Sequence, residues 1–215
     1  MCSLSISKHY HIEALLLAAG ESKRFNGSKQ LALINGKPML INTLAVLMHT
    51  NVELITVVLG AYAQAIQQAL NESELSTTRN PKMRTVLALN WQQGMGASIA
   101  AGVKNIDEHA THVFIGLADQ VAISAKQCNL MLKQSRENPD NIIAAFYNGK
   151  LGAPAIFPKT YFAELATLQN DHGARTILRT NLANIISVPM DEAAKDIDTT
   201  ADLLSYISNP QRMKT

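Results

Sequence analysis

Residues 12–31 read IEALLLAAGESKRFNGSKQL. The first part, Ile12–Leu17, is apolar apart from one glutamate, and it predicts a buried β-strand. The strand breaks at Gly20 into a short polar loop that carries three cationic side chains. Small residues at the break let the backbone approach a ligand closely, and successive N–H groups in such a turn bind anions. This stretch therefore predicts an anion-binding loop after the first strand.

The loop differs from the two common phosphate-binding motifs. A Walker loop needs Lys followed by Ser or Thr, whereas Lys29 is followed by Gln30. The dinucleotide fingerprint needs three closely spaced glycines, and this stretch holds only Gly20 and Gly27. Both motifs are excluded. Arg24 and Lys29 are then the candidate phosphate-binding cations, and the alternative is a structural basic turn.

Apolar runs alternate with helix-period segments along most of the chain. The predicted strands are Ile12–Leu17, Leu54–Gly60, Arg84–Asn90, His112–Leu117 and Asn141–Tyr147. The predicted helices are Met39–His49, Ala61–Leu70, Ala97–Lys104, Ala125–Gln134 and Lys159–Leu168. This rhythm is typical of α/β proteins with right-handed crossovers. We therefore predict a Rossmann-like three-layer sandwich, with a mostly parallel mixed sheet, helices on both faces and ligands at the carboxyl ends of the strands.

Length and composition limit the class of protein. A chain of 215 residues, 47% hydrophobic and 17% charged, fits one globular domain, with 1–11 and 209–215 as flexible ends and Ser73–Lys82 as a surface connection. A net charge of +2 gives no dense basic stripe for nucleic acid. Cys2 and Cys128 suit reduced thiols, and no apolar run is long enough to span a membrane. We expect a cytoplasmic protein that binds neither nucleic acid nor membrane.

A second turn and a set of carboxylates extend the predicted site. Asn90–Ser98 ends a strand with a glycine-bearing turn before a helix, which presents free N–H groups or is a plain connection. Asp119 falls just past the carboxyl end of a strand, where either a metal ligand or a helix cap is common. Asp196 and Asp198 share one side if their segment is extended, and Asp202 lies in the first turn of a final helix.

Five motifs in order carry a resemblance to a known family. They are Leu17-Ala-Ala-Gly-x-Ser-x-Arg with Lys29, Asn90-x-x-x-Gly-Met-x-x-Ser98, Gly116-Leu-Ala-Asp119, the turns Gly152-Ala-Pro154 and Asp171-His-Gly-Ala-Arg175, and Asp196-Ile-Asp-Thr. The pattern resembles the molybdenum-cofactor cytidylyltransferase (MocA-type) branch of the MobA-like nucleotidyltransferases. Such enzymes are implied to join the CMP of CTP to the phosphate of molybdenum-loaded molybdopterin and to release pyrophosphate. The implied cofactor is Mg²⁺, and the implied partners are CTP, a phosphorylated pterin, and a molybdoenzyme or its chaperone.

The resemblance also implies residue roles. The implied catalytic residues are Arg24, Lys29 and Asp119, and the implied metal ligands are Asp119 and Asp198. The implied nucleotide-binding residues are Leu17, Ala18, Ala19, Gly20, Ser22, Arg24, Lys29, Gly60, Asn90, Gly94, Ser98 and Asp119. The implied acceptor-binding residues are Gly152, Pro154, Asp171, Gly173 and Arg175, although Arg175 could instead pair with Asp171 for structural reasons.

Departures from the family pattern leave the acceptor open. They are Asn26 and Asn170 at usual glycines, Val121 and Thr200 at usual prolines, and Ala153 at a usual histidine. The charged residues of the motifs are kept, and the Ala18-Ala19-Gly20 form looks like the cytidylyl version. The alternatives are a nucleotidyltransferase for a sugar phosphate or methylerythritol phosphate, use of GTP as the donor, and a non-catalytic protein that delivers molybdenum cofactor.

Overall fold

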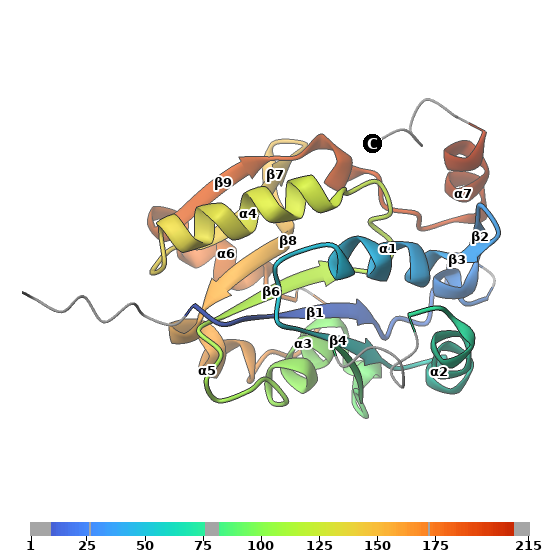
Figure 1. Ribbon diagram of the computed structural model, residues 1–215, viewed down its shortest axis with the longest axis horizontal. Helices are drawn as coiled ribbons and strands as arrows, with labels where there is room; N and C mark the ends of the chain where they lie inside the picture. The colour runs from blue at the N-terminus through green and yellow to red at the C-terminus, as the bar shows by residue number, and fades with distance from the viewer. Residues whose placement is uncertain (1–9, 26, 76–81, 172, 209–215) are drawn as a thin grey trace, which may run out of the picture.

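The computed structural model describes residues 10–25, 27–75, 82–171 and 173–208. Its centre is a seven-stranded sheet in the order β5-β4-β1-β6-β8-β7-β9, drawn in Figure 1. The strands are β1 (Ile12–Ala18), β4 (Leu54–Leu59), β5 (Met83–Leu87), β6 (His112–Leu117), β7 (Ile142–Tyr147), β8 (Lys150–Pro158) and β9 (Ile185–Pro189). A separate hairpin joins β2 (Leu33–Ile34) and β3 (Lys37–Pro38).

The sheet has a parallel part and a mixed part. β5, β4, β1 and β6 run parallel to one another, with Leu16 opposite both Val57 and Gly116. β8 runs antiparallel to both β6 and β7, and β9 is parallel to β7. The predicted mostly parallel mixed sheet is confirmed.

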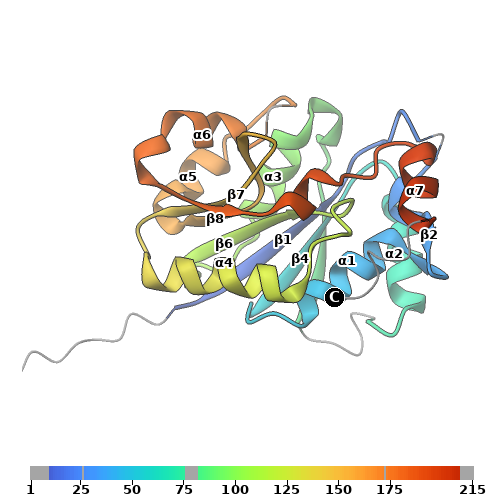
Figure 2. The ribbon, with the colours of Figure 1, turned by 90° about the horizontal axis from the view of Figure 1, so that it is seen from above.

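Helices cover both faces of the sheet, as Figure 2 shows from above. The helices are α1 (Met39–Met48), α2 (Ala63–Glu72), α3 (Met95–Val103), α4 (Ala125–Glu137), α5 (Phe162–Leu165), α6 (Arg175–Thr180) and α7 (Thr200–Ile207). Because side chains alternate along a strand, Leu16 joins the core with α1, α2 and α4, whereas Leu15 and Leu17 join the core with α3, α5 and α6. The three-layer arrangement follows from this double burial.

Local sequence signals explain where α1, α4 and α7 begin. Ser124 caps α4 through a reciprocal pair of hydrogen bonds with Gln127. Thr199 and Asp202 form the same capping box at the start of α7, so Asp202 lies in its first turn, as predicted. Pro38 immediately precedes α1, where its missing N–H is tolerated.

The second half of the chain differs from the sequence prediction. The Gly152–Pro154 segment, expected to be a compact turn, lies inside β8, and the predicted helix over 159–168 is reduced to α5 after the 3-10 turn Lys159–Tyr161. Neither β9 nor α6 is predicted from the sequence. Both are short, and β9 is a strand only because it pairs with β7, a contact that local periodicity does not encode.

The predicted flexible ends fall mainly on 1–9 and 209–215, which lie outside the described residues, as do 76–81 of the predicted surface connection. Tyr10 and His11 are described, and both are tied to the fold. The Tyr10 hydroxyl donates to Ser135 Oγ at 2.6 Å, and the His11 N–H donates to Thr111 Oγ1 at 3.1 Å. Over the described ranges, no helix is long and apolar enough to cross a membrane.

Candidate active site

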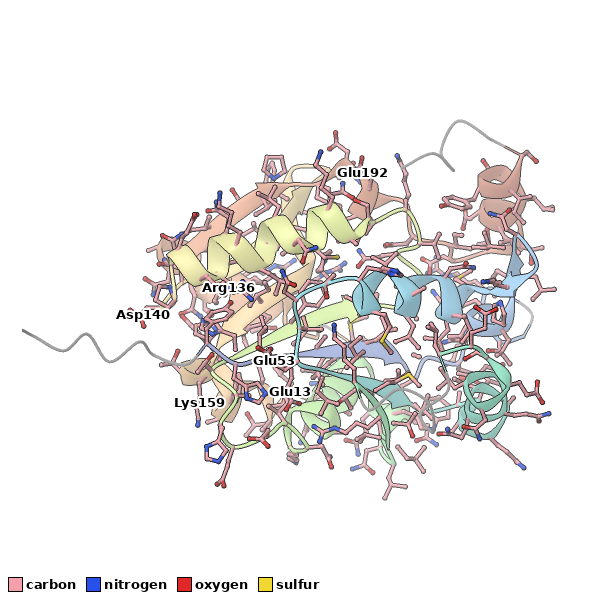
Figure 3. The ribbon with its side chains drawn as sticks, in the orientation of Figure 1. Glu13, Glu53, Arg136, Asp140, Lys159 and Glu192 are labelled. Carbon is pink, nitrogen blue, oxygen red and sulfur yellow. The ribbon has the colours of Figure 1, made fainter. Side chains whose placement is uncertain are left out.

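The main cleft lies at the carboxyl ends of β1 and β6 and has a volume of about 500 Å³. Parallel strands bring their carboxyl ends to one edge, so the segments that follow β1 and β6 meet there. The 19–23 loop, Lys29 and Gln30 form one wall, and the turn from Trp91 to Ser98 forms another. Asp119 and Asp171 add two carboxylates to the lining. Glu13 and Glu53, labelled in Figure 3, lie near the start of β1, at the other end of the sheet.

A buried glutamine holds the first loop in shape. Gln30 is 3% exposed, and its Nε2 donates to the Gly20 carbonyl at 3.0 Å. Its Oε1 accepts from Ser28 Oγ at 2.9 Å. Ser22 has φ 58°, a left-handed conformation that few non-glycine residues adopt. The loop is therefore set before any ligand arrives, and Gln30 is a residue that the sequence analysis did not identify.

Three predicted residues, Lys29, Asp119 and Asp198, form one ion cluster, and a fourth, Arg24, contacts it. Lys29 Nζ lies 2.5 Å from Asp119 Oδ2 and 2.8 Å from Asp198 Oδ1. Arg24 lies 2.7 Å from Asp198 Oδ2. Burial by itself lowers the pKa of Lys29, but the two carboxylates outweigh it and hold that pKa above its ordinary value. Burial raises the pKa of Asp198, and Lys29 and Arg24 together outweigh it, so the pKa of Asp198 is below its ordinary value.

The carboxylates of this cluster fit the requirements of Mg²⁺. Asp119 Oδ1 is buried and has no hydrogen-bond partner, so it is free to accept a cation or its water. Within the part of the chain that the structure describes, no group of three or more His, Cys, Asp or Glu side chains could hold a metal. Mg²⁺ commonly takes only one or two protein carboxylates and completes its shell with phosphate oxygens and water. Asp119 and Asp198 therefore suit a metal that arrives with a phosphorylated ligand.

A smaller side chamber of about 60 Å³ adjoins the main cleft and shares Leu17, Met95 and Leu117 with it. Its polar lining comes from Tyr147, Arg175 and Asp196, and most of the rest is apolar. Burial, followed by the charges of Asp119 and Asp198, raises the pKa of Asp196 to about 6. Asp196 Oδ1 also lacks a hydrogen-bond partner. The chamber thus contains a carboxylate that no described cation neutralises by direct contact.

The structure divides the predicted nucleotide-binding residues into two groups. Those that line the main cleft are Leu17, Ala19, Gly20, Ser22, Lys29, Gly94, Ser98 and Asp119. Those outside its lining are Ala18, Arg24, Gly60 and Asn90. Arg24 reaches the site through Asp198, and Gly60 supports the loop, because a Cβ there would lie 2.3 Å from the Ala19 carbonyl oxygen.

The predicted acceptor residues are also divided. Gly152 and Arg175 line the side chamber, whereas Asp171 lines the main cleft. No ion pair joins Arg175 to Asp171 among the salt bridges of the described residues. Pro154 lies within β8 behind a cis peptide bond, and Gly173 has φ 53° and packs against Met95.

The structure explains some of the departures from the family pattern. Asn170 has φ 68°, a conformation that Asn tolerates better than most residues, so it can replace glycine there. Thr200 is the first residue of α7, a position where proline is also accepted. Asn26 lies outside the described residues.

Some residues that line the two cavities had no role assigned to them from the sequence, although Asp196 and the Asn90–Ser98 turn, which contains Trp91 and Gln92, were singled out. Trp91 and Gln92 line the main cleft, and Asp196 and Tyr147 line the side chamber. The signal for Trp91 was its position three residues before Gly94 in the glycine-bearing turn, which equally suits a residue at the edge of the core. Tyr147 gave no signal, because it is brought to the site by the pairing of β7 with β8.

Comparison with known proteins agrees with this geometry. A family model for the MobA-like NTP transferase domain matches residues 14–185. Nicotine blue oxidoreductase of Paenarthrobacter nicotinovorans is 28% identical over 205 residues, which cover 89% of this chain and 94% of the relative.

Solved structures share the fold at lower identity. Rv0371c from Mycobacterium tuberculosis H37Rv matches with a TM-score of 0.78 at 23% identity, over 93% of this chain and 99% of its own. A structure of 4-diphosphocytidyl-2C-methyl-D-erythritol synthase from Anaerococcus prevotii matches with a TM-score of 0.72 at 14% identity, over 94% and 96% of the two chains. At these identities the likeness shows the fold alone.

Proposed function

Because the chain belongs to the family of MobA-like NTP transferase domains, we propose that it transfers CMP from CTP to the phosphate of molybdenum-loaded molybdopterin and releases pyrophosphate. The observation that carries the proposal is the ion cluster of Lys29, Asp119 and Asp198 at the edge of the main cleft. It combines a cation for phosphates with carboxylates for a metal, next to a preformed anion-binding loop.

The reaction needs positioning and charge neutralisation more than it needs a side-chain nucleophile. An acceptor phosphate oxygen forms a bond to the α-phosphorus of CTP, and the bond from that phosphorus to the α–β bridging oxygen breaks. Pyrophosphate leaves with the electron pair. The acceptor phosphate is already ionised near neutral pH, so no general base is required. Binding both anions in one cleft overcomes their mutual repulsion.

The residues of this chain would divide that task. The Gly20 loop presents backbone N–H groups to the triphosphate, and Lys29 and Arg24 add full charges for the β- and γ-phosphates. Asp119 and Asp198 would hold the Mg²⁺, which, when bound, stabilises negative charge on the phosphates. Trp91 and Gln92 line another wall of the main cleft, where a base could stack and form hydrogen bonds.

The choice of CTP rests on the Ala18-Ala19-Gly20 form of the loop and needs its own test. We expect α-labelled CTP to give labelled product with molybdenum-loaded molybdopterin, and equimolar GTP or ATP to give at least about tenfold less, a difference of about 1.4 kcal/mol in transition-state binding. A preference for GTP would overturn the choice of base while leaving the transferase assignment in place.

The acceptor is tested by product analysis. Incubation of the purified protein with CTP, Mg²⁺ and molybdenum-loaded molybdopterin should yield a cytosine dinucleotide form of the cofactor and stoichiometric pyrophosphate. The same assay with methylerythritol phosphate and with sugar phosphates tests the alternative acceptors. Faster pyrophosphate release with one of these compounds would show that it, and not the pterin, is the acceptor. Transfer of the product to a molybdoenzyme or its chaperone would follow as a separate step.

Two rivals belong to other classes of protein. The name of the sequence relative suggests an oxidoreductase, which would need an electron donor in the main cleft. Oxidation of NADH or NADPH without pyrophosphate release would favour it. A delivery protein that binds molybdenum cofactor without catalysis would show stoichiometric binding and no pyrophosphate. The ion cluster favours the transferase over both, since neither rival requires two carboxylates and a lysine around a phosphate loop.

A further inference from the structure

β6 and β8 separate beside the proposed site. Their pairing runs from His112 opposite Pro158 to Ile115 opposite Ala155 and stops there. On the other side of β8 the register shifts, since Ala144 lies opposite Ala155 but Ala145 lies opposite Gly152. Ala153 and Pro154 are thus extra residues in a bulge. The side chamber lies at this separation, lined by Leu117, Gly152, Ala153 and Asp196.

Gln120 spans the separation. The residue is 1% exposed and follows Asp119 directly. Its Nε2 donates to the Ala153 carbonyl at 2.9 Å and to the Ala193 carbonyl at 3.1 Å. The first carbonyl belongs to the bulge of β8, and the second lies at the end of the 3-10 turn Asp191–Ala194, which leads into the Asp196–Asp198 segment.

The carboxamide matches these two carbonyls chemically. An NH₂ group has two donors, and each carbonyl outside regular pairing needs one. An apolar side chain at this position would leave the buried Ala193 carbonyl and the part-buried Ala153 carbonyl without this donor, so the bulge and the C-terminal segment would shift until they found water. Next to Gln120, the Asp119 carbonyl accepts from the Ile197 N–H at 3.3 Å. Residues 119 and 120 therefore contact three segments, which are β8, the 3-10 turn Asp191–Ala194 and the Asp196–Asp198 segment.

We propose that Gln120 is a positioning residue for the transfer. It touches no reacting atom, and it fixes the β8 wall of the side chamber and the Asp196–Asp198 segment relative to Asp119. This role rests on the proposed function, because it assigns the β8 wall to the acceptor. Transfer rates depend steeply on the alignment of the two reactants, so a small displacement of that wall lowers turnover while the nucleotide loop is unchanged.

The test compares Gln120→Met with Gln127→Met. Gln127 Nε2 donates to Glu192 Oε2 at 2.6 Å, on the same 3-10 turn but away from β8, and Gln127 also forms the capping box of α4. Glu192 is labelled beside the beginning of α4 in Figure 3. The control variant loses at least as many hydrogen bonds, so general destabilisation affects both proteins. Trp91 is the single tryptophan and lines the main cleft, so its fluorescence reports CTP binding.

We expect Gln120→Met to lower kcat/KM for molybdenum-loaded molybdopterin by about tenfold or more, while the Kd for CTP stays within about twofold of the wild type. Gln127→Met should stay within about twofold in both quantities. Equal losses in CTP binding and transfer, or the same loss in both variants, would overturn the role of Gln120. If the Met variant fails to fold, Gln120→Asn takes its place, because its amide is one methylene too short to reach the carbonyls. This variant should also lose kcat/KM for the acceptor while its Kd for CTP is kept. No transfer by the wild type would overturn the proposed function itself, and this role with it.

Discussion

The main cleft and the side chamber are built in different ways. The main cleft is about 500 Å³, lies at the ends of parallel strands, and is walled by polar loops. The side chamber is about 60 Å³, lies where the antiparallel strands β6 and β8 separate, and is mostly apolar. The parallel arrangement brings loop ends together without further help. The bulged antiparallel arrangement needs a side chain, Gln120, to hold its separated strands.

Two neighbouring carboxylates show the same contrast. Asp198 faces Lys29 and Arg24, and its pKa lies below the ordinary value. Asp196 faces the side chamber, where burial and two nearby carboxylates raise its pKa to about 6. The residues are of one type and stand two positions apart. Burial raises the pKa of both residues, but only Asp198 is in direct contact with cations that outweigh the effect of burial.

The largest expected effect is a loss of transfer activity when charged residues of the main cleft are replaced. Lys29→Ala or Asp119→Ala should lower transfer by roughly 10³-fold, because each removes a charge that acts on the phosphates or the metal. Pyrophosphate release measures the loss, and circular dichroism confirms that the fold is kept. Lys133→Ala is the matched control, since the Lys133 side chain on α4 is 68% exposed, pairs with Glu137 and lies outside the lining of the main cleft. Near-normal turnover in either site variant would show that the main cleft does not take part in the reaction.

Glycine substitutions should separate the two regions by stability. A Cβ at Gly152 would lie 2.4 Å from the Tyr147 hydroxyl, whereas nothing lies within 4 Å of a Cβ at Gly20. Gly152→Ala should therefore lower the free energy of unfolding by about 1–3 kcal/mol, and Gly20→Ala by less than about 0.5 kcal/mol. Urea denaturation measures both. Adding Tyr147→Phe to Gly152→Ala should restore part of the loss, and equal losses in the two alanine variants would contradict the contrast.

The smallest expected effect concerns the pH dependence of stability. Because the folded pKa of Asp196 is about 6, above the ordinary 3.8, folding favours its protonated form. That contribution to stability is complete below about pH 4 and is lost as the pH rises through 6. Asp196→Asn should thus exceed the wild type in free energy of unfolding by on the order of 1 kcal/mol at pH 7–8, with no gain near pH 4. Urea denaturation in the presence of a metal chelator measures this difference. A gain in the free energy of unfolding that does not vary with pH would contradict the prediction.

The sequence analysis predicted the parallel part of the fold better than the mixed part. β1, β4 and β6 are buried on both faces, so their apolar runs are continuous and their bounds are nearly those predicted. β9 includes residues that are only partly buried and ends at a proline, so its pattern is weak. The Gly152–Pro154 segment has the composition of a turn, yet it lies in β8 because the residues before and after it pair with β7.

The candidate site shows the same division. Lys29, Asp119 and Asp198 could be named because each stands in a motif with chemical meaning, even though 90 and 169 positions separate Lys29 from its two partners. Gln30, Gln120 and Tyr147 could not be named, since a buried polar side chain is recognised by the groups it meets and not by its neighbours in the chain. The partners of Gln120 lie 33 and 73 positions away, whereas those of Gln30 and Tyr147 are near in the chain and are met only through the loop or hairpin that the fold forms.

By itself, the sequence determined the α/β class, the anion-binding loop after the first strand and the identity of the charged residues, because periodicity, small residues and charge are local properties. Only the tertiary structure decided that Lys29 lies between two distant carboxylates, that Arg24 acts through Asp198, and that a bulge in β8 opens a chamber beside the cleft. The physical reason is that pairing, burial and pKa depend on contacts between segments far apart in the chain.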